Sequence, residues 1–211
     1  DDTEGVELAE GASDADAVVL PAWRSPLKGL PSANPLERLA MTAAALRTLP
    51  APLAKRARID DWELRRGRVT YSYETLRRLK AALPHTKLTF LVGAASWQTL
   101  PRWKRPQELA KLAGFLVGRR PGAPNPKSSP GFPALEVLPG TFPDLSSTLL
   151  RARLLLGEEP RELASAVRAV ARRLYGAAMR ARLAKELPGG RYEHTLAVGR
   201  MALELALRHG L

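Results

Sequence analysis

Short apolar segments alternate with amphipathic helical segments along most of the chain, and this alternation restricts the possible folds more than any other feature. The apolar segments with the length of strands are residues 17–20, 58–60, 88–93, 115–117 and 135–138. Apolar residues at helical spacing predict helices between them, over residues 35–46, 71–83, 106–113 and 146–156. Because strands that alternate with helices pair in parallel, we expect an α/β fold with helices on both faces of a parallel sheet.

Two of these helices carry further local signals. The helix over residues 35–46 is expected to bury one face, made of Leu36, Leu39, Ala40, Ala43 and Leu46. The helix over residues 71–83 has Thr70 or Ser72 as its candidate N-cap. Its expected buried stripe is Leu76, Leu79 and Leu83.

The final part of the chain is helical in character. Residues 160–175 form one predicted helix, which Gly176 can end, and the next break is Pro188-Gly189-Gly190. We therefore place a domain boundary near Gly176, with residues 1–176 as one domain and residues 177–211 as a helical C-terminal tail. A tail of about 35 residues is too short to bury its own core, so it either docks or begins a truncated domain.

Composition excludes several classes of protein. The chain has no Cys, which excludes disulfides, thiolate catalysis and Cys-bound zinc. No apolar run approaches the ~20 residues of a membrane-spanning helix, and the acidic residues 1–16 are not a signal peptide. The net charge of +12 comes from scattered Arg and Lys, which favours an anionic small-molecule ligand over nucleic acid. We expect a cytoplasmic protein without membrane or nucleic-acid partners, and homo-oligomer formation stays open.

Residues 144–151 form a candidate anion site. Ser146, Ser147 and Thr148 precede an apolar helix, where unpaired backbone N–H groups and the helix dipole favour a negative group. Arg151 follows one turn later and can bind a phosphate through both arms of its guanidinium. The alternative interpretation is an ordinary N-cap without a ligand.

A series of short motifs resembles the bacterial nicotinate mononucleotide adenylyltransferases. Ser146, Thr148 and Arg151 match the family's late Ser-x-Thr-x-x-Arg motif. The other matches are WRSPLKG at 23–29, RLAM at 38–41, ELRRGRVTYSYETL at 63–76, FLVG at 90–93, LPRW at 100–103 and RRPG at 119–122. Each motif is weak alone, but the ordered series spans residues 18–176. The resemblance implies a Rossmann-like parallel sheet and a nucleotidyltransferase of NAD biosynthesis.

The resemblance also implies a reaction and a set of binding residues. AMP would pass from ATP, accompanied by Mg²⁺, to nicotinate mononucleotide, yielding nicotinate adenine dinucleotide and pyrophosphate. Trp103 would stack on the nicotinate ring, while Tyr71 and Ser72 would lie near its carboxylate, mostly through backbone N–H groups. Lys28 and Arg120 would contact substrate phosphates. The residues that would hold ATP are Ser146, Ser147, Thr148 and Arg151.

Two departures from the family pattern bear on activity. The family opens with a strand and a Gly-Gly-x-Phe-Asp-Pro-x-His-x-Gly-His segment, whose His pair binds the triphosphate. The histidines here are His85, His194 and His209, none of them so spaced, and no catalytic residue is identified. An Asp of the family's Gly-x-Asp-Ser segment is replaced by Ala95. Either the opening motif is missing and turnover by the chain as printed is slow, or the chain is a non-catalytic nucleotide-binding relative.

The tail has a resemblance of its own. Arg191–Val198 (RYEHTLAV) is similar to the opening of HD-type metal-dependent phosphohydrolases. Such sites need a later His-Asp pair and another Asp, and the chain contains no His-Asp dipeptide. His194 would therefore be a ligand without partners, and no metal site is predicted. We expect the chain to stop inside the first helix of that second domain.

Overall fold

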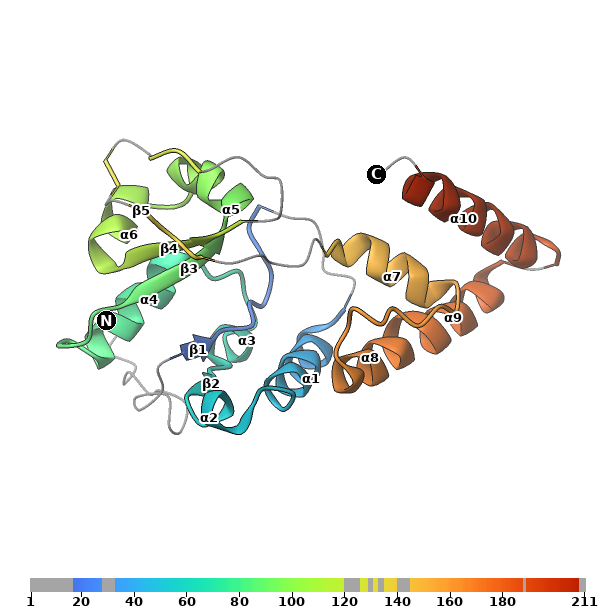
Figure 1. Cartoon of the computed structure of the whole chain (residues 1–211), viewed down its shortest axis with the longest axis horizontal. Helices are drawn as coiled ribbons and strands as arrows, with labels where there is room; N and C mark the ends of the chain where they lie inside the picture. Colours follow the sequence, from blue (N-terminus) through green and yellow to red (C-terminus); the bar gives the residue numbers. More distant parts are fainter. Residues whose placement is uncertain are drawn as a thin grey trace. The chain divides into compact units, whose positions relative to one another are not determined.

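The computed structural model describes residues 17–27, 33–119, 126–128, 131–132, 135–139, 145–187 and 189–208. The chain divides into two compact units, one containing residues 1–31 and 58–144 and the other residues 32–57 and 145–211 (Figure 1). Among the described residues, no helix is long and apolar enough to cross a membrane. The predicted α/β fold, with parallel strands flanked by helices, is confirmed.

The first unit is built on short strands. The strands β3 (Thr89–Gly93), β4 (Gly114–Gly118) and β5 (Leu135–Val137) form a parallel sheet in that order. In this sheet, Val92 lies opposite Val117, and Val117 lies opposite Val137. A separate two-stranded sheet joins β1 (Ala17–Val19) to β2 (Ala57–Ile59). All five predicted strands therefore form, in two sheets.

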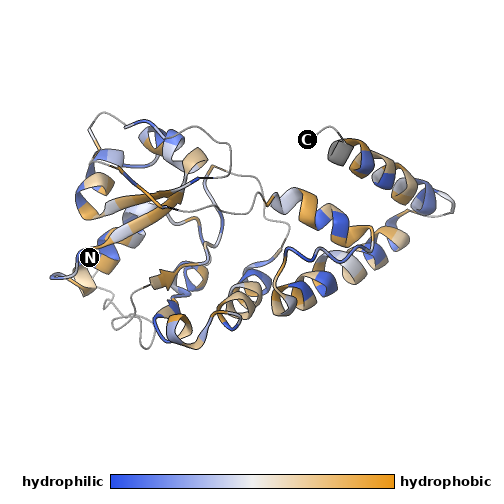
Figure 2. Ribbon diagram, viewed as in Figure 1, coloured by the Kyte–Doolittle hydropathy of each residue, from blue (hydrophilic) through white to orange (hydrophobic). Residues whose placement is uncertain are grey.

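The core of the first unit lies on the three-stranded sheet. The strands β3 and β4 are apolar along most of their length, whereas apolar and polar residues alternate on the helices (Figure 2). The helix α5 (Ala94–Thr99), which the sequence did not predict, places Trp97 in this core with its ring centroid 5.4 Å from that of Phe115. The Trp97 indole N–H also donates to the carbonyl of Lys127 at 2.8 Å, which ties the loop before β5 to the core.

The first unit has three further helices, α3 (Trp62–Arg65), α4 (Ser72–Ala82) and α6 (Pro106–Leu112). The first residues of one of them, α4, line the cavity described below. In α4, Leu76 and Leu79 are buried as predicted. The predicted cap was wrong, because Ser72 is already helical and the N-cap is Tyr71. The hydroxyl of Thr70 instead donates to the Arg68 carbonyl at 3.4 Å.

The second unit is helical. It comprises α1 (Pro35–Leu46), α2 (Ala51–Ala54), α7 (Ser147–Leu155), α8 (Ser165–Ala171), α9 (Met179–Glu186) and α10 (Arg191–Arg208). The predicted bounds of α1 are confirmed, but the prediction that Leu36 is buried was wrong, since it is 74% exposed. Ala44 is fully buried instead, because α1 packs on α8 and Leu36 lies in the first turn, away from the core.

Gly176 does not end a helix. The predicted helix over residues 160–175 begins only at Ser165 and continues without a break through the π-helical segment Arg172–Ala178 into α9. A Cβ atom at Gly176 would lie 3.1 Å from the carbonyl oxygen of Leu154, so glycine permits close packing on α7. One helical turn after Gly176, Arg180 Nη1 donates to the Leu155 carbonyl at 3.2 Å, which is a second contact with α7. The domain boundary at Gly176 stays a prediction.

Candidate functional site

A cavity of about 120 Å³ lies in the first unit. Its lining comes from three segments that are distant in sequence: Ser25–Leu27, Tyr71–Tyr73 and Arg102–Lys104. The structure thus brings Tyr71, Ser72 and Trp103 together around one cavity. These are three of the five residues predicted to contact a mononucleotide, whose individual roles stay predictions.

Trp103 is an apolar wall of the cavity with a fixed orientation. It is only partly buried, its indole N–H donates to the Thr99 hydroxyl at 3.2 Å, and its ring meets Phe90 edge to face at 6.2 Å. It follows the turn Leu100–Arg102, which continues α5 beyond the end of β3. Because these contacts hold the indole from the core side, part of the ring remains available to the cavity.

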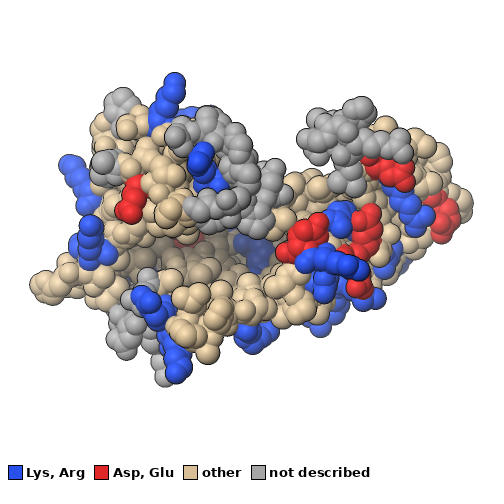
Figure 3. All heavy atoms as spheres, viewed as in Figure 1, with Lys and Arg blue, Asp and Glu red and all other residues tan. Residues whose placement is uncertain are grey.

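Cationic side chains surround the aromatic residues of the cavity. The ammonium of Lys104 lies 4.3 Å from the ring centroid of Tyr71. The guanidinium of Arg105 lies 5.2 Å from that of Tyr73, and its Nη1 donates to the Tyr73 hydroxyl at 3.4 Å. Lys and Arg also prevail over Asp and Glu on the first unit's visible surface (Figure 3). These cations favour an anionic ligand.

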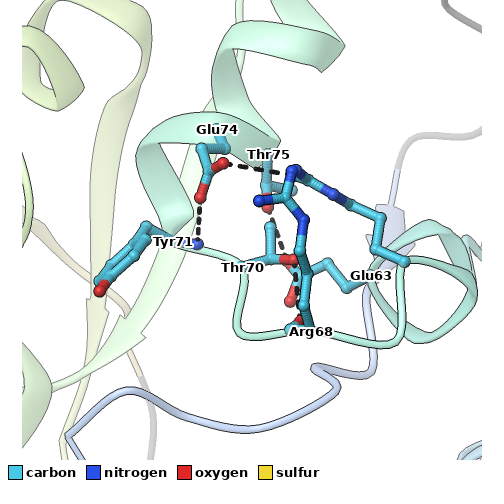
Figure 4. Close-up of polar contacts among 7 residues, drawn as sticks. Glu63, Arg68, Thr70, Tyr71, Glu74 and Thr75 are labelled. Carbon is cyan, nitrogen blue, oxygen red and sulfur yellow. Dashed lines mark hydrogen bonds and ion pairs between the residues drawn. The ribbon is translucent and has the colours of Figure 1, made fainter. Parts of the chain in front are cut away.

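Two glutamates support the start of α4 behind the cavity (Figure 4). Glu74 Oε2 accepts from the backbone N–H of Tyr71 at 3.0 Å, and Glu74 Oε1 accepts from Arg66 at 3.4 Å. Glu63 is buried and accepts from the Thr75 hydroxyl at 2.6 Å. Burial raises the pKa of Glu63, and the nearby charges of Asp60 and Glu74 raise it further, against the lowering effect of Thr75. The sequence reasoning missed both glutamates, although a Glu three residues after a helix start is a capping signal.

A buried ion pair lies beneath the same helix. Arg78 Nη1 donates to Asp60 Oδ2 at 2.6 Å, with the two side chains 6% and 0% exposed. Asp60 Oδ1 also accepts from the Trp62 N–H at 3.0 Å. The guanidinium of Arg66 lies 4.6 Å from the centroid of the Trp62 ring, and the guanidinium of Arg78 lies 4.8 Å from it. These contacts fix α4 on β2 and α3.

The second predicted set of ligand residues lies at the start of α7, in the other unit. Ser146 is the N-cap, and its hydroxyl accepts from the Leu149 N–H at 3.4 Å. Arg151 Nη2 donates to the Thr148 hydroxyl at 3.3 Å, and its guanidinium lies 6.0 Å from the Tyr175 ring centroid. Ser147 and Thr148 are exposed. The capped helix start is confirmed, while its binding of ATP stays a prediction.

The remaining candidate residues are either exposed or outside the described residues. Lys28, Arg120 and His209 lie outside the described residues. His85, Ala95 and His194 are exposed. Within the described ranges, no three His, Cys, Asp or Glu side chains are grouped so as to hold a metal ion.

Known proteins that resemble the chain agree with the sequence motifs. No protein-family model matches it. A protein of Marinobacter nauticus named "Probable nicotinate-nucleotide adenylyltransferase" is 31% identical over 179 residues, which cover 75% of this chain and 80% of the relative. A relative with the same name from Herpetosiphon aurantiacus is 33% identical, with coverages of 68% and 73%.

A solved structure shares the fold. The nicotinic acid mononucleotide adenylyltransferase of Plasmodium falciparum, complexed with NaAD, matches with a TM-score of 0.58 at 16% identity. The match covers 72% of this chain and 78% of that protein. From the identity to the curated relatives over most of their length, the chain belongs to the nicotinate-nucleotide adenylyltransferase family.

Proposed function

We propose that this chain transfers AMP from ATP to nicotinate mononucleotide, giving nicotinate adenine dinucleotide and pyrophosphate. The observation that carries the proposal is the cavity, which gathers Tyr71, Ser72 and Trp103 in a chain of this family. The cavity is small, so it suits the nicotinate ring, with the ribose and phosphate outside it. An electron-poor pyridinium ring is attracted to the face of a Trp side chain.

The chemistry needs positioning and charge neutralisation rather than a covalent enzyme intermediate. An oxygen of the mononucleotide phosphate attacks the α-phosphorus of ATP, and the bond from that phosphorus to the bridging oxygen breaks, which releases pyrophosphate. Arg102 and Lys104 line the cavity and supply positive charge. Ser146, Ser147, Thr148 and Arg151 hold ATP, and Lys28 and Arg120 contact phosphates. Mg²⁺ enters as part of the ATP complex and is therefore a component of the substrate.

Titration and product analysis test this function. Calorimetry with nicotinate mononucleotide and with ATP should show binding of each, and chromatography of the mixture should show formation of the dinucleotide. Nicotinamide mononucleotide and GTP serve as controls for the two substrates. Absence of binding by both proposed substrates would overturn the proposal.

A non-catalytic nucleotide-binding relative is the second candidate. Ala95 in place of an expected Asp favours it. Binding of both nucleotides without any dinucleotide product would support this candidate over the enzyme.

Residues 177–211 receive a separate proposal, that they are the helical start of an HD-like domain. The RYEHTLAV motif lies at the start of α10, with His194 exposed. Since His194 takes no part in the proposed adenylyl transfer, His194→Ala should leave both nucleotide affinities unchanged in calorimetry. A loss of affinity for either nucleotide would contradict this division of roles. A cytoplasmic location and the oligomeric state stay predictions.

A further inference from the structure

We propose that Glu74 is a positioning residue for the mononucleotide cavity, because its carboxylate holds the backbone of Tyr71 and Ser72 in the cavity wall. This inference rests on the proposed function. It assigns no contact between Glu74 and a substrate. Its starting point is the hydrogen bond from the Tyr71 N–H to Glu74 Oε2, 3.0 Å long, at the point where α4 begins.

The charge of Glu74 is compensated within the protein. Arg66 Nη1 lies 3.4 Å from Glu74 Oε1, and the two side chains are only 18% and 23% exposed. Arg66 is itself held against the face of Trp62. A neutralised pair can stand behind an anion site without repelling an anionic ligand as strongly as a lone carboxylate would.

The bond to Glu74 also decides which backbone donors a ligand can use. The Tyr71 N–H is occupied by Glu74, so it is not available to a nicotinate carboxylate. The N–H groups of Ser72 and Tyr73, the first residues of α4, have no acceptor within an α-helix. Of the two residues proposed to lie near the ligand carboxylate, Ser72 therefore keeps its backbone donor and Tyr71 does not.

Tyr71 is fixed at its ring as well as at its backbone. Figure 4 shows its side chain extending away from the Glu74 carboxylate. The Tyr71 ring lines the cavity and lies 4.3 Å from the Lys104 ammonium. The next residue after Glu74, Thr75, is tied to the buried Glu63. Releasing Glu74 would therefore free one backbone segment between two fixed points, rather than unfold α4.

Another glutamate in the chain provides a matched control. Glu37 is the third residue of α1, as Glu74 is of α4, and its carboxylate accepts from the Asn34 N–H at 2.7 Å. This cap belongs to the second unit and lines no part of the cavity. A purely structural role for Glu74 predicts that Glu74→Ala and Glu37→Ala behave alike.

The experiment compares Glu74→Ala, Glu74→Gln and Glu37→Ala in the full chain by calorimetry and thermal unfolding. Glu74→Ala should weaken nicotinate mononucleotide binding about tenfold, while ATP affinity stays within about twofold. Glu74→Gln should restore affinity to within about threefold of the original, because the amide oxygen can accept the same N–H. Glu37→Ala should lower the melting temperature and leave the mononucleotide affinity unchanged.

Two outcomes would overturn the inference: equal mononucleotide affinity in Glu74→Ala and the unmodified chain, or equal losses in Glu74→Ala and Glu37→Ala. Amide hydrogen exchange of Tyr71 by NMR provides a readout that needs no ligand. The Tyr71 amide should be protected in the unmodified chain and in Glu74→Gln, and exchange faster in Glu74→Ala. If the unmodified chain binds no mononucleotide, the proposed function fails, and unchanged Tyr71 exchange in Glu74→Ala would separately refute the role of Glu74.

Discussion

The cavity of the first unit and the start of α7 in the second unit both carry predicted substrate residues, yet they are built in opposite ways. Three separate segments of sequence form the cavity, and the contacts of Glu63, Glu74 and Asp60 place one of them. The start of α7 is a run of consecutive residues whose hydrogen bonds are local, from Leu149 to Ser146 and from Arg151 to Thr148. A distant substitution can therefore damage the cavity, whereas the α7 start depends mainly on its own helix.

The largest expected effect comes from breaking the buried ion pair between Arg78 of α4 and Asp60. Arg78→Met would leave the Asp60 carboxylate buried without its cation, which typically costs about 3–5 kcal/mol of the free energy of unfolding. Urea unfolding measures this loss. The control is Arg182→Met, which removes an exposed pair with Glu186 and should cost less than about 1 kcal/mol. Similar losses in the two variants would contradict the importance of tertiary support.

The second-largest expected effect concerns the start of α7. Arg151→Met should weaken ATP binding by about 1.5–3 kcal/mol, the usual contribution of a hydrogen bond to a charged group. Mononucleotide affinity should not change, because Arg151 lies outside the residues that line the cavity. Calorimetry with each nucleotide separately is the measurement. Equal losses for the two nucleotides would remove the distinction between the sites.

The reciprocal substitution is Trp103→Ala. Loss of a stacking aromatic side chain should weaken nicotinate mononucleotide binding by ~1–3 kcal/mol and leave ATP binding almost unchanged. Trp103→Phe keeps a ring at this position and should give an intermediate affinity. A larger loss for ATP than for the mononucleotide would show that Trp103 is assigned to the wrong substrate.

The smallest expected effect is a pH dependence of the free energy of unfolding, which arises from Glu63. The pKa of Glu63 is raised above its ordinary value of 4.5, so folding favours its protonated form. The stabilising contribution of this carboxyl is complete below about pH 4.5 and is lost as the pH rises through its folded-state pKa. Glu63→Gln, whose amide oxygen can still accept from Thr75, should thus gain stability relative to the unmodified chain as the pH rises. Urea unfolding over a pH series measures the difference, which should stay constant if Glu63 does not titrate.

Most helices and strands were predictable, because their signals are local. The alternation of apolar segments located all five strands, and the bounds of α1 were predicted to the residue. The errors arose where a neighbouring element decides the outcome. Leu36 fits the apolar stripe of α1, but no neighbouring element among the described residues packs on it and it is exposed. Gly176 is a plausible helix end, yet the approach of the Leu154 carbonyl gives this glycine a packing role inside a continuous helix.

The sequence by itself determined the α/β architecture, the motifs that relate the chain to its family, and the capped start of α7. Each of these depends on residues that are close together in the chain or on their order along it. Only the tertiary structure decided that residues 25–27, 71–73 and 102–104 surround one cavity and that Glu63 is buried with a raised pKa. Burial and convergence depend on contacts between distant segments, and periodicity along a single chain carries no record of those contacts.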